Sequence, residues 1–391
     1  MKRKLIYLIL VLLMAGAAAA QDVSVRSDHP DEYTVVGGDT LWDIAGKFLE
    51  HPWQWPAIWH ANQQIENPHL IYPGDVLSLV YIDGEPRLMV DRGKPVTKLS
   101  PTARATSRKP ITAIDHDSIA GYIRNVRMVS AEQYETLPYV VANYEGRNLI
   151  AEPGRTYVRG LAGNVGDRYA VVRLANIYYS RKGVKERARE PGYGQHAPTS
   201  VEYHPGFWEA VANYPANRGD VIGFELYEVT QGTVLKTGDP AILKLELGLD
   251  VIKEGDFVVP LDDLGYPEHY MPHAMDAVPE GLEVLAVQGD NRLVGHNKIV
   301  SISGGSNQGV EPGHVFSAFR PGQQVRDNVK YPASSLADAS TWNGDKVTLP
   351  DEYDGHIMVF RVFDEVSYAL IMGGSREIQE FDILRHPDEK L

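Results

Sequence analysis

The chain has 391 residues, of which 43% are hydrophobic and 23% charged, and its formal net charge is -14. This length predicts more than one domain, and the composition is ordinary for a globular protein. The acidic balance, without a basic stripe to neutralise phosphates, excludes nucleic-acid binding, and the absence of cysteine excludes disulfides, thiolate metal sites, cysteine nucleophiles and a lipid-anchoring cysteine.

The N-terminal end has the three zones of a secretory signal peptide. A basic start at 2–4 is followed by an apolar run at 5–14 and by small residues at 18–20. The apolar run is shorter than the ~20 residues needed to cross a bilayer, which argues against a membrane anchor. We therefore predict that residues 1–20 are a signal peptide cleaved near Ala20, and that the mature chain is periplasmic without a stable transmembrane segment.

Residues 32–82 form the most strongly patterned block of the mature chain. Residues 32–36 suit a strand, and a glycine pair ends it. Asp39 stands where its carboxylate can accept the free amide hydrogens at the start of a helix, so we predict that it is the N-cap. The helix is predicted from an apolar stripe at i, i+3, i+4, i+7 and i+8, which comprises Leu41, Ile44, Ala45, Phe48 and Leu49.

A second helix is predicted around Pro56, because the first turn of a helix tolerates proline. Turns follow at Asn67-Pro68 and Pro73-Gly74, and residues 76–80 have the composition of a closing strand. The block therefore predicts the order strand–helix–helix–strand.

This order and these residues resemble the LysM family. The resemblance is carried by Tyr33-Thr34-Val35, Gly38-Asp39-Thr40-Leu41-Trp42, Ile44-Ala45, Asn62 and residues 67–74. It implies a βααβ fold that binds N-acetylglucosamine-containing glycans, here peptidoglycan. Two departures are mild: Gly37 stands where the family often has lysine or glutamate, and the connection between the helices is rich in tryptophan.

In the LysM family the sugar lies in a shallow groove between the first strand–helix loop and the second helix–strand loop. Carried over position by position, the implied glycan-binding residues are Gly38, Asp39, Thr40 and Leu41 on one side and Asn67, His69, Leu70 and Ile71 on the other. Loop amides and the apolar side chains of this set could bind an N-acetyl group, because such sites combine an apolar lining with few polar groups.

Some of these residues also have structural explanations. We expect Asp39 to act mainly as a helix cap rather than as a direct ligand, and His69 has an alternative as a loop residue without sugar contact. Trp42 and Trp59 are expected in the core rather than as platforms for a sugar ring. No metal, cofactor or catalytic role is predicted for any of them.

The remainder of the chain is predicted to be rich in strands. Residues 83–110, with many Pro, Arg, Lys, Ser and Thr, are predicted to be a linker. Beyond them, short runs of Val, Ile, Tyr and Phe between Gly, Pro and Asp predict a first β-rich domain at 111–220, a second unit at 221–280 and a C-terminal domain at 281–391. The predicted fold class is α+β: a small βααβ domain followed by a larger, mainly-β region.

Two stretches of the β-rich region look like copies of one unit. The matching segments are 223–229 with 355–361, 241–245 with 368–372, and 255–260 with 381–385. Gly166-Asp167 and Gly313-His314 repeat the beginning of such a strand. We predict repeated small antiparallel units, and ordinary turn chemistry before a strand is the alternative explanation.

The β-rich region lacks the patterns of common wall hydrolases. No His-x-His element and no Gly-x-Ser-x-Gly elbow occur in the sequence. His269 and His273 are four residues apart, but Tyr270 stands in place of a zinc-protease glutamate and Pro272 would break the helix. A zinc amidase whose ligands are dispersed along the chain stays open.

The same region is similar to the corresponding part of a group of proteobacterial LysM-domain proteins of undefined role, through 137–141, 309–315 and 359–364. The leading hypothesis is a non-enzymatic protein that binds peptidoglycan in the cell envelope, with the β-rich region as a scaffold or a docking part for an envelope protein. The alternatives are a cell-wall hydrolase with an unrecognised catalytic domain and an accessory factor of a trans-envelope assembly.

Overall fold

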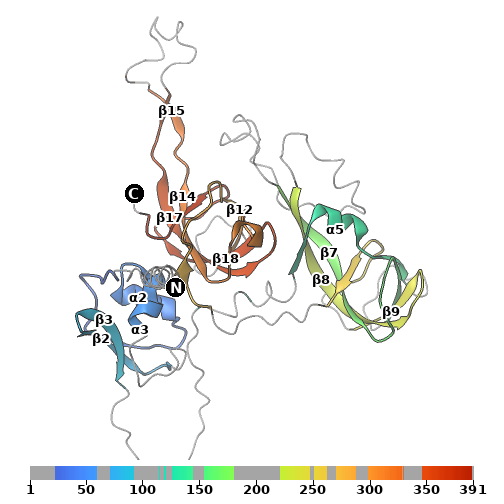
Figure 1. Ribbon diagram of the computed structural model, residues 1–391, viewed down its shortest axis with the longest axis horizontal. Helices are drawn as coiled ribbons and strands as arrows, with labels where there is room; N and C mark the ends of the chain where they lie inside the picture. Colours follow the sequence, from blue (N-terminus) through green and yellow to red (C-terminus); the bar gives the residue numbers. More distant parts are fainter. Residues whose placement is uncertain are drawn as a thin grey trace, which may run out of the picture. The chain divides into compact units, whose positions relative to one another are not determined.

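The chain forms two compact units, residues 1–114 and residues 115–391 (Figure 1). The first contains short helices beside a small sheet, and the second is built mainly from strands, so the predicted α+β class is confirmed. The predicted signal peptide at 1–20 lies outside the residues that the structure describes. This computed structural model describes residues 23–59, 71–91, 114, 119, 126–143, 154–179, 221–246, 251–261, 270–287, 298–327, 329 and 346–389.

The N-terminal unit has the predicted strand–helix–helix–strand order. Its first elements are β1 (Glu32–Thr34), α2 (Leu41–Phe48), the 3-10 helix η1 (Pro52–Gln54), α3 (Trp55–Trp59) and β2 (Val76–Ile82). β2 runs antiparallel to β1, with Thr34 opposite Val76. The last residue of β1 and the first residue of β2 are therefore neighbours at one end of the sheet.

A third strand extends this sheet beyond the predicted block. β3 (Glu85–Asp91) pairs antiparallel with β2 along its whole length, so the prediction that a linker begins at residue 83 is wrong for this segment. Asp83 and Gly84 make the connection with φ angles of 54° and 86°. Two residues of positive φ match the right-handed twist of a hairpin, and Asp-Gly is a preferred pair for it.

The apolar stripe of α2 forms the centre of the N-terminal core, as predicted. Leu41, Ile44, Ala45, Phe48 and Leu49 are all buried, and so are the predicted core residues Trp42 and Trp59. The stripe packs in one cluster with residues from the other elements, namely Val35, Trp55, Ile58, Trp59, Ile71, Leu77 and Leu88. β3 thus contributes a side chain to the core through Leu88.

The first sheet of the second unit has the strand order β4-β8-β7-β10-β5-β6-β9. Its strands are β4 (Val126–Val129), β5 (Tyr139–Asn143), β6 (Arg155–Arg159), β7 (Arg168–Tyr179), β8 (Val221–Lys236), β9 (Ala241–Leu245) and β10 (Phe257–Pro260). Because β9 also pairs with β8, the strands from β8 to β9 close into a ring. The short helix α5 (Ala131–Thr136) stacks Tyr134 on Phe224 of β8, with ring centroids 4.2 Å apart.

The second sheet has the order β11-β14-β17-β18-β13-β12, and β19 pairs with β14. Backbone bonds from Val284 to Asp382 (2.9 Å) and from Leu384 to Leu282 (2.8 Å) join β12 to β19, so this sheet closes as well. Between β14 and β17 along the chain, β15 (Gln324–Arg326) and β16 (Lys346–Thr348) form a separate antiparallel pair (Figure 1). The strands of the second sheet are β11 (His273–Ala274), β12 (Val284–Val287), β13 (Ile299–Ile302), β14 (His314–Arg320), β17 (Glu352–Val362), β18 (Ser367–Gly374) and β19 (Ile383–Arg385).

The two closed sheets have the same strand order. The ring is β7-β8-β9-β6-β5-β10 in the first sheet and β14-β17-β18-β13-β12-β19 in the second, and matched strands follow in the same order along the chain. The segments predicted to be copies lie on matched strands: β8 with β17, β9 with β18, and β10 with β19. The predicted repetition is therefore confirmed at the level of topology.

The predicted division of this region is wrong at two places. β7 and β8 lie on either side of the boundary at 220/221, yet they are neighbours in one sheet, with Tyr179 opposite Val221. β11, in the predicted 221–280 unit, pairs with β14 of the second sheet. The errors have one cause: sheet pairing joins strands across long connections, so a long polar stretch such as 180–220 is a poor marker of a domain boundary.

One four-residue turn recurs before strands and before α2. In each copy the fourth residue donates its N–H to the first carbonyl, and the side chain of the fourth residue accepts the N–H of the first. The third residue has a positive φ, which favours glycine. The copies are 36–39, 72–75, 164–167, 253–256, 311–314 and 379–382, and the fourth residue is aspartate in all of them except 311–314. The N-terminal unit also contains this turn. The turn is therefore not specific to the two closed sheets, and their repetition is shown by their common strand order.

Candidate functional site

The first predicted wall of the glycan site is the turn between β1 and α2. Gly38 has a φ of 100°, and a Cβ atom on it would meet nothing within 4 Å, so its conformation and not a close contact requires glycine. Asp39 closes the turn by accepting the N–H of Val36 at 2.8 Å and the hydroxyl of Tyr33 at 2.9 Å. Burial, followed by this bond to Asp39, raises the pKa of Tyr33, which therefore stays a donor.

The N-cap of α2 is Thr40 and not Asp39, which corrects the prediction. The Thr40 hydroxyl accepts the N–H of Asp43 at 3.1 Å, and the Asp43 carboxylate accepts the N–H of Thr40 at 3.1 Å. This reciprocal pair is a capping box, which satisfies two of the amide groups that a helix start leaves open. Asp39 lies one residue earlier and holds the turn instead.

The second predicted wall is only partly described. Ile71 is fully buried, whereas Asn67, His69 and Leu70 lie outside the described residues. The turn that follows Ile71 is held by Asp75, whose carboxylate accepts the N–H of Tyr72 at 3.1 Å.

The two turns are joined directly by the backbone. Val35 donates its N–H to the carbonyl of Asp75 at 2.9 Å and accepts the N–H of Gly74 at 2.8 Å. The turn after β1 and the turn before β2 are thereby held side by side at one end of the sheet. This is the arrangement that a groove between these two loops needs.

The exposed surface at this end differs in part from the predicted one. Leu41 and Ile71 are 2% and 0% exposed, so they support the loops from beneath. Val36 is 58% exposed beside the glycine pair and is an apolar group that the sequence analysis did not select. The sequence does contain a signal for Val36. A large apolar residue directly before the two glycines of a turn is not expected to be buried.

The tryptophans near the helices belong to the core. Trp53 and Trp55 are 2% and 1% exposed, and Trp42 and Trp59 are buried as predicted. A side chain that stacks on a sugar must present its ring face to solvent, so these rings do not serve as platforms in this structure.

Comparison with known proteins assigns a family to the N-terminal block. Residues 33–80 match the family model of the LysM domain. The chain is also 42% identical over 60 residues to the "Uncharacterized protein YqbP" of Bacillus subtilis (strain 168), an alignment that covers 13% of this chain and 27% of that relative. The chain thus spans about a quarter of the length of the relative it matches.

The N-terminal unit therefore contains a LysM domain, a binding module without catalytic function, and LysM domains generally bind glycans of the peptidoglycan and chitin type. The folded module is longer than the family match, because β3 follows residue 80. Within the described ranges, no helix combines the length and the apolar character needed to cross a membrane.

Proposed function

We propose that this protein binds the N-acetylglucosamine-containing glycan of peptidoglycan through its LysM domain, without catalysing a reaction on it. The observation that carries the proposal is the pair of backbone-joined turns at 36–39 and 72–75, within the segment that matches the LysM model. A rigid pair of loops can present amide groups at fixed positions, which lowers the entropic cost of binding.

The proposed site combines two walls. Gly38, Asp39 and Thr40 form one wall above the buried Leu41, and Asn67, His69 and Leu70 form the other beside the buried Ile71. The side chains of Asp39 and Thr40 are already engaged in the turn and the cap, so they act by fixing the backbone. Val36 supplies an exposed apolar surface for the methyl group of an N-acetyl substituent.

The proposed location is the periplasm, in association with the cell wall. It rests on the basic, apolar and small-residue zones of residues 1–20 and on the chemistry of the glycan, which lies outside the cytoplasmic membrane. A single shallow module binds weakly, and a dense polymer of repeated sugars raises the apparent affinity through multiple attachments.

The second unit is proposed to act as a scaffold or as a docking part for another envelope protein. Its two closed sheets have interiors made from apolar side chains of different strands, such as Val171 with Leu243 and Ile357 with Ala369. Such interiors hold the surface loops at fixed positions and leave the outer surface for contacts.

Co-sedimentation of the full chain with insoluble peptidoglycan tests the proposal. The unaltered chain is expected in the pellet, and Val36→Glu should weaken binding by about tenfold or more, which corresponds to roughly 1.4 kcal/mol. Tyr81→Glu is the matched control, because Tyr81 is 62% exposed at the far end of β2, opposite Pro86.

The results of this assay distinguish glycan binding itself from the location of the binding site. A full chain that stays in the supernatant, while an established LysM protein pellets, overturns the function. Equal binding by Val36→Glu and Tyr81→Glu overturns the location of the site and leaves glycan binding itself standing. Asn67→Ala and His69→Ala test the second wall in the same assay.

A further inference from the structure

The turn at 311–314 differs from its copies in one residue. At the matched position of the first closed sheet, Asp167 accepts the N–H of Asn164 at 2.7 Å. At the start of β14 the ring of His314 does the same task, since its Nδ1 accepts the N–H of Glu311 at 3.0 Å. An aspartate serves this turn in the other copies, so the turn alone gives no reason for an imidazole at residue 314.

A second histidine lies beside this turn. β11 runs parallel to β14 with His273 opposite His314, and the centroids of the two rings are 4.6 Å apart. The approach is close at Gly313: a Cβ atom there would lie 2.4 Å from the carbonyl oxygen of Met271 and 3.0 Å from the His273 ring. Glycine at this position allows the backbone of the turn to reach the histidine.

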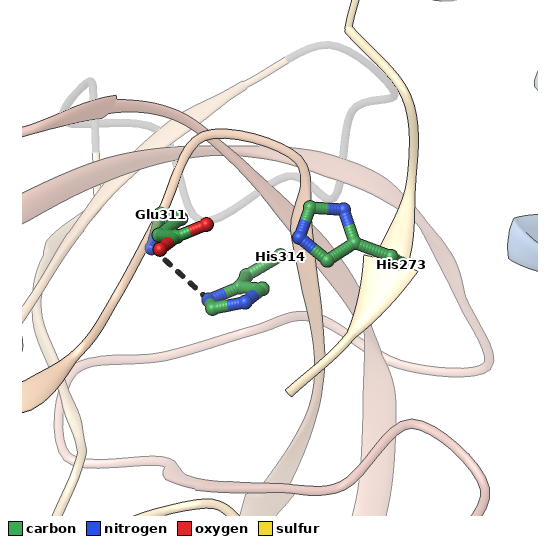
Figure 2. Close-up of side chains that lie close together, drawn as sticks. All are labelled: His273, Glu311 and His314. Carbon is green, nitrogen blue, oxygen red and sulfur yellow. Dashed lines mark hydrogen bonds between the residues drawn. The ribbon is translucent and has the colours of Figure 1, made fainter. Parts of the chain in front are cut away.

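The hydrogen bonds of His273 leave one ring nitrogen available. Its Nδ1 lies 2.9 Å from the carbonyl oxygen of Met271, which can only accept, so Nδ1 carries the proton. The lone pair is then on Nε2, the nitrogen that faces Glu311 and His314 (Figure 2). A bond from the far nitrogen to a backbone carbonyl is the usual support of a metal-binding histidine.

We propose that His273, Glu311 and His314 form a binding site for one divalent transition-metal ion of the zinc type. A ligand atom from each of the three side chains lies within 4.8 Å of those of the other two. Two imidazoles and one carboxylate are a ligand set that suits Zn²⁺ and leaves a fourth position for water or for a group from another molecule.

The three groups must move closer to hold an ion. Zn²⁺ bonds of about 2.0–2.1 Å in a tetrahedral arrangement place the ligand atoms roughly 3.3 Å apart. Glu311 is exposed, so its side chain is the one with room to move, whereas His314 is 6% exposed within the sheet. Burial, followed by the neighbouring His273, lowers the pKa of His314.

Metal binding competes with one existing bond. In a neutral ring a single nitrogen has a free lone pair, and His314 uses that lone pair to accept the N–H of Glu311. An ion that takes the lone pair releases this amide to solvent. We therefore expect moderate affinity, below that of a closed structural zinc site, and a site that can load and unload.

No metal site is predicted from the sequence, where His273 stands near His269 but far from Glu311 and His314. The ligands come instead from two segments that β11 and β14 bring together, and this pairing has no spacing signature along the chain. This proposal is independent of glycan binding by the LysM domain, since its residues lie in the other unit.

Zinc binding by the full chain tests the proposal. After treatment with a chelator and its removal, the protein is titrated with Zn²⁺ alone in equilibrium dialysis. His273→Ala and His314→Asn are each expected to reduce the affinity of one site by more than tenfold, because even the outer partners of a metal ligand contribute about 10–100-fold. His386→Ala, which removes a half-exposed histidine of the same unit, is the matched control and should bind like the unaltered chain.

The variants keep the test interpretable. Asparagine at residue 314 can still accept the N–H of Glu311 through its side-chain oxygen, so the turn is preserved, and far-UV circular dichroism checks the fold. His273→Ala provides a second route if His314→Asn unfolds. Absence of zinc binding by the unaltered chain, or binding that neither variant weakens, overturns the proposal.

Discussion

Arg173 on β7 and Arg320 on β14 hold matching positions in the two closed sheets. Each lies the same number of residues after the recurring turn, which ends at Asp167 in one sheet and at His314 in the other. Each guanidinium binds a buried carboxylate, Asp256 at 2.7 Å in the first sheet and Asp354 at 2.8 Å in the second. The repetition thus extends from strand order to an arginine that binds a buried carboxylate.

The two ion pairs differ in where the carboxylate comes from. Asp256 is the last residue of the turn before β10, and the matching residue before β19 is Asp382. In the second sheet Arg320 donates instead to Asp354 of β17. Asp382 is 1% exposed, and its burial, together with the nearby charge of Asp354, raises its pKa to about 7.

The raised pKa of Asp382 predicts a stability that falls as the pH rises. The folded chain keeps the proton up to a pH of about 7, whereas an unfolded aspartate loses it near pH 3.9. Between these values the folded state binds more protons, so the free energy of unfolding is highest at the acidic end and decreases by up to about 1.4 kcal/mol per pH unit. Above pH 7 the contribution is lost.

Asp382→Asn should flatten this part of the pH profile. Asparagine is neutral like the protonated acid. The Asp382 carboxyl accepts the N–H of Gln379 at 2.7 Å, and the side-chain oxygen of asparagine can accept it too. Urea denaturation of the full chain, followed by far-UV circular dichroism at about pH 5 and pH 7, measures the difference. Parallel profiles for the variant and the unaltered chain contradict the prediction.

Removal of Arg173 alone from its ion pair should strongly lower the free energy of unfolding. Asp256 is fully buried, so Arg173→Met leaves its charge without the arginine, and such a change costs about 3–5 kcal/mol. Arg159→Met is the control, because Arg159 and Asp239 are both 53% exposed and a solvent-screened surface pair contributes little to stability. The same denaturation measurement compares them, and equal losses would show that the buried pair is not special.

The parts of the fold that were predicted correctly depend on local patterns. The stripe from Leu41 to Leu49 fixes α2 because helix periodicity is set by neighbours along the chain. The hairpin of β3 also had a local signal in Asp83-Gly84, but Pro86 and the charged residues around it favoured a linker. Proline is tolerated on an edge strand, which is where β3 lies.

Other features could not be predicted because they depend on pairing across the chain. The repeated segments indicated copies of a unit, but the pairing of β6 with β9, which the ring needs, joins strands far apart in the sequence. The proximity of His273 and His314 has the same origin. The turn and helix start at 36–41 were locally predictable, with an error of one residue at the cap, because Asp39 and Thr40 are both good N-cap residues.

The capping box of α2 can be tested through Thr40. Thr40→Ala removes the acceptor for the N–H of Asp43 and should destabilise the N-terminal unit by about 1–2 kcal/mol, whereas Thr40→Ser keeps the hydroxyl and should cost less. Tryptophan fluorescence reports mainly on this unit, because four of the six tryptophans lie in it, namely Trp42, Trp53, Trp55 and Trp59. If Ala and Ser behave alike, the hydroxyl does not cap the helix.

β3 should be an integral part of the LysM unit and not an appendage. Leu88 is 2% exposed in the common core, and the neighbouring Arg87 donates to the carbonyl of Ala57 in α3 at 2.8 Å. Leu88→Ala is therefore expected to destabilise the unit by about 2–5 kcal/mol, as for other large-to-small changes in a core. Met89→Ala, on the opposite face of the strand and 39% exposed, should change stability by no more than about 0.5 kcal/mol. Urea denaturation followed by tryptophan fluorescence of the full chain distinguishes the two, and a Leu88→Ala midpoint equal to that of Met89→Ala would return β3 to the role of a linker.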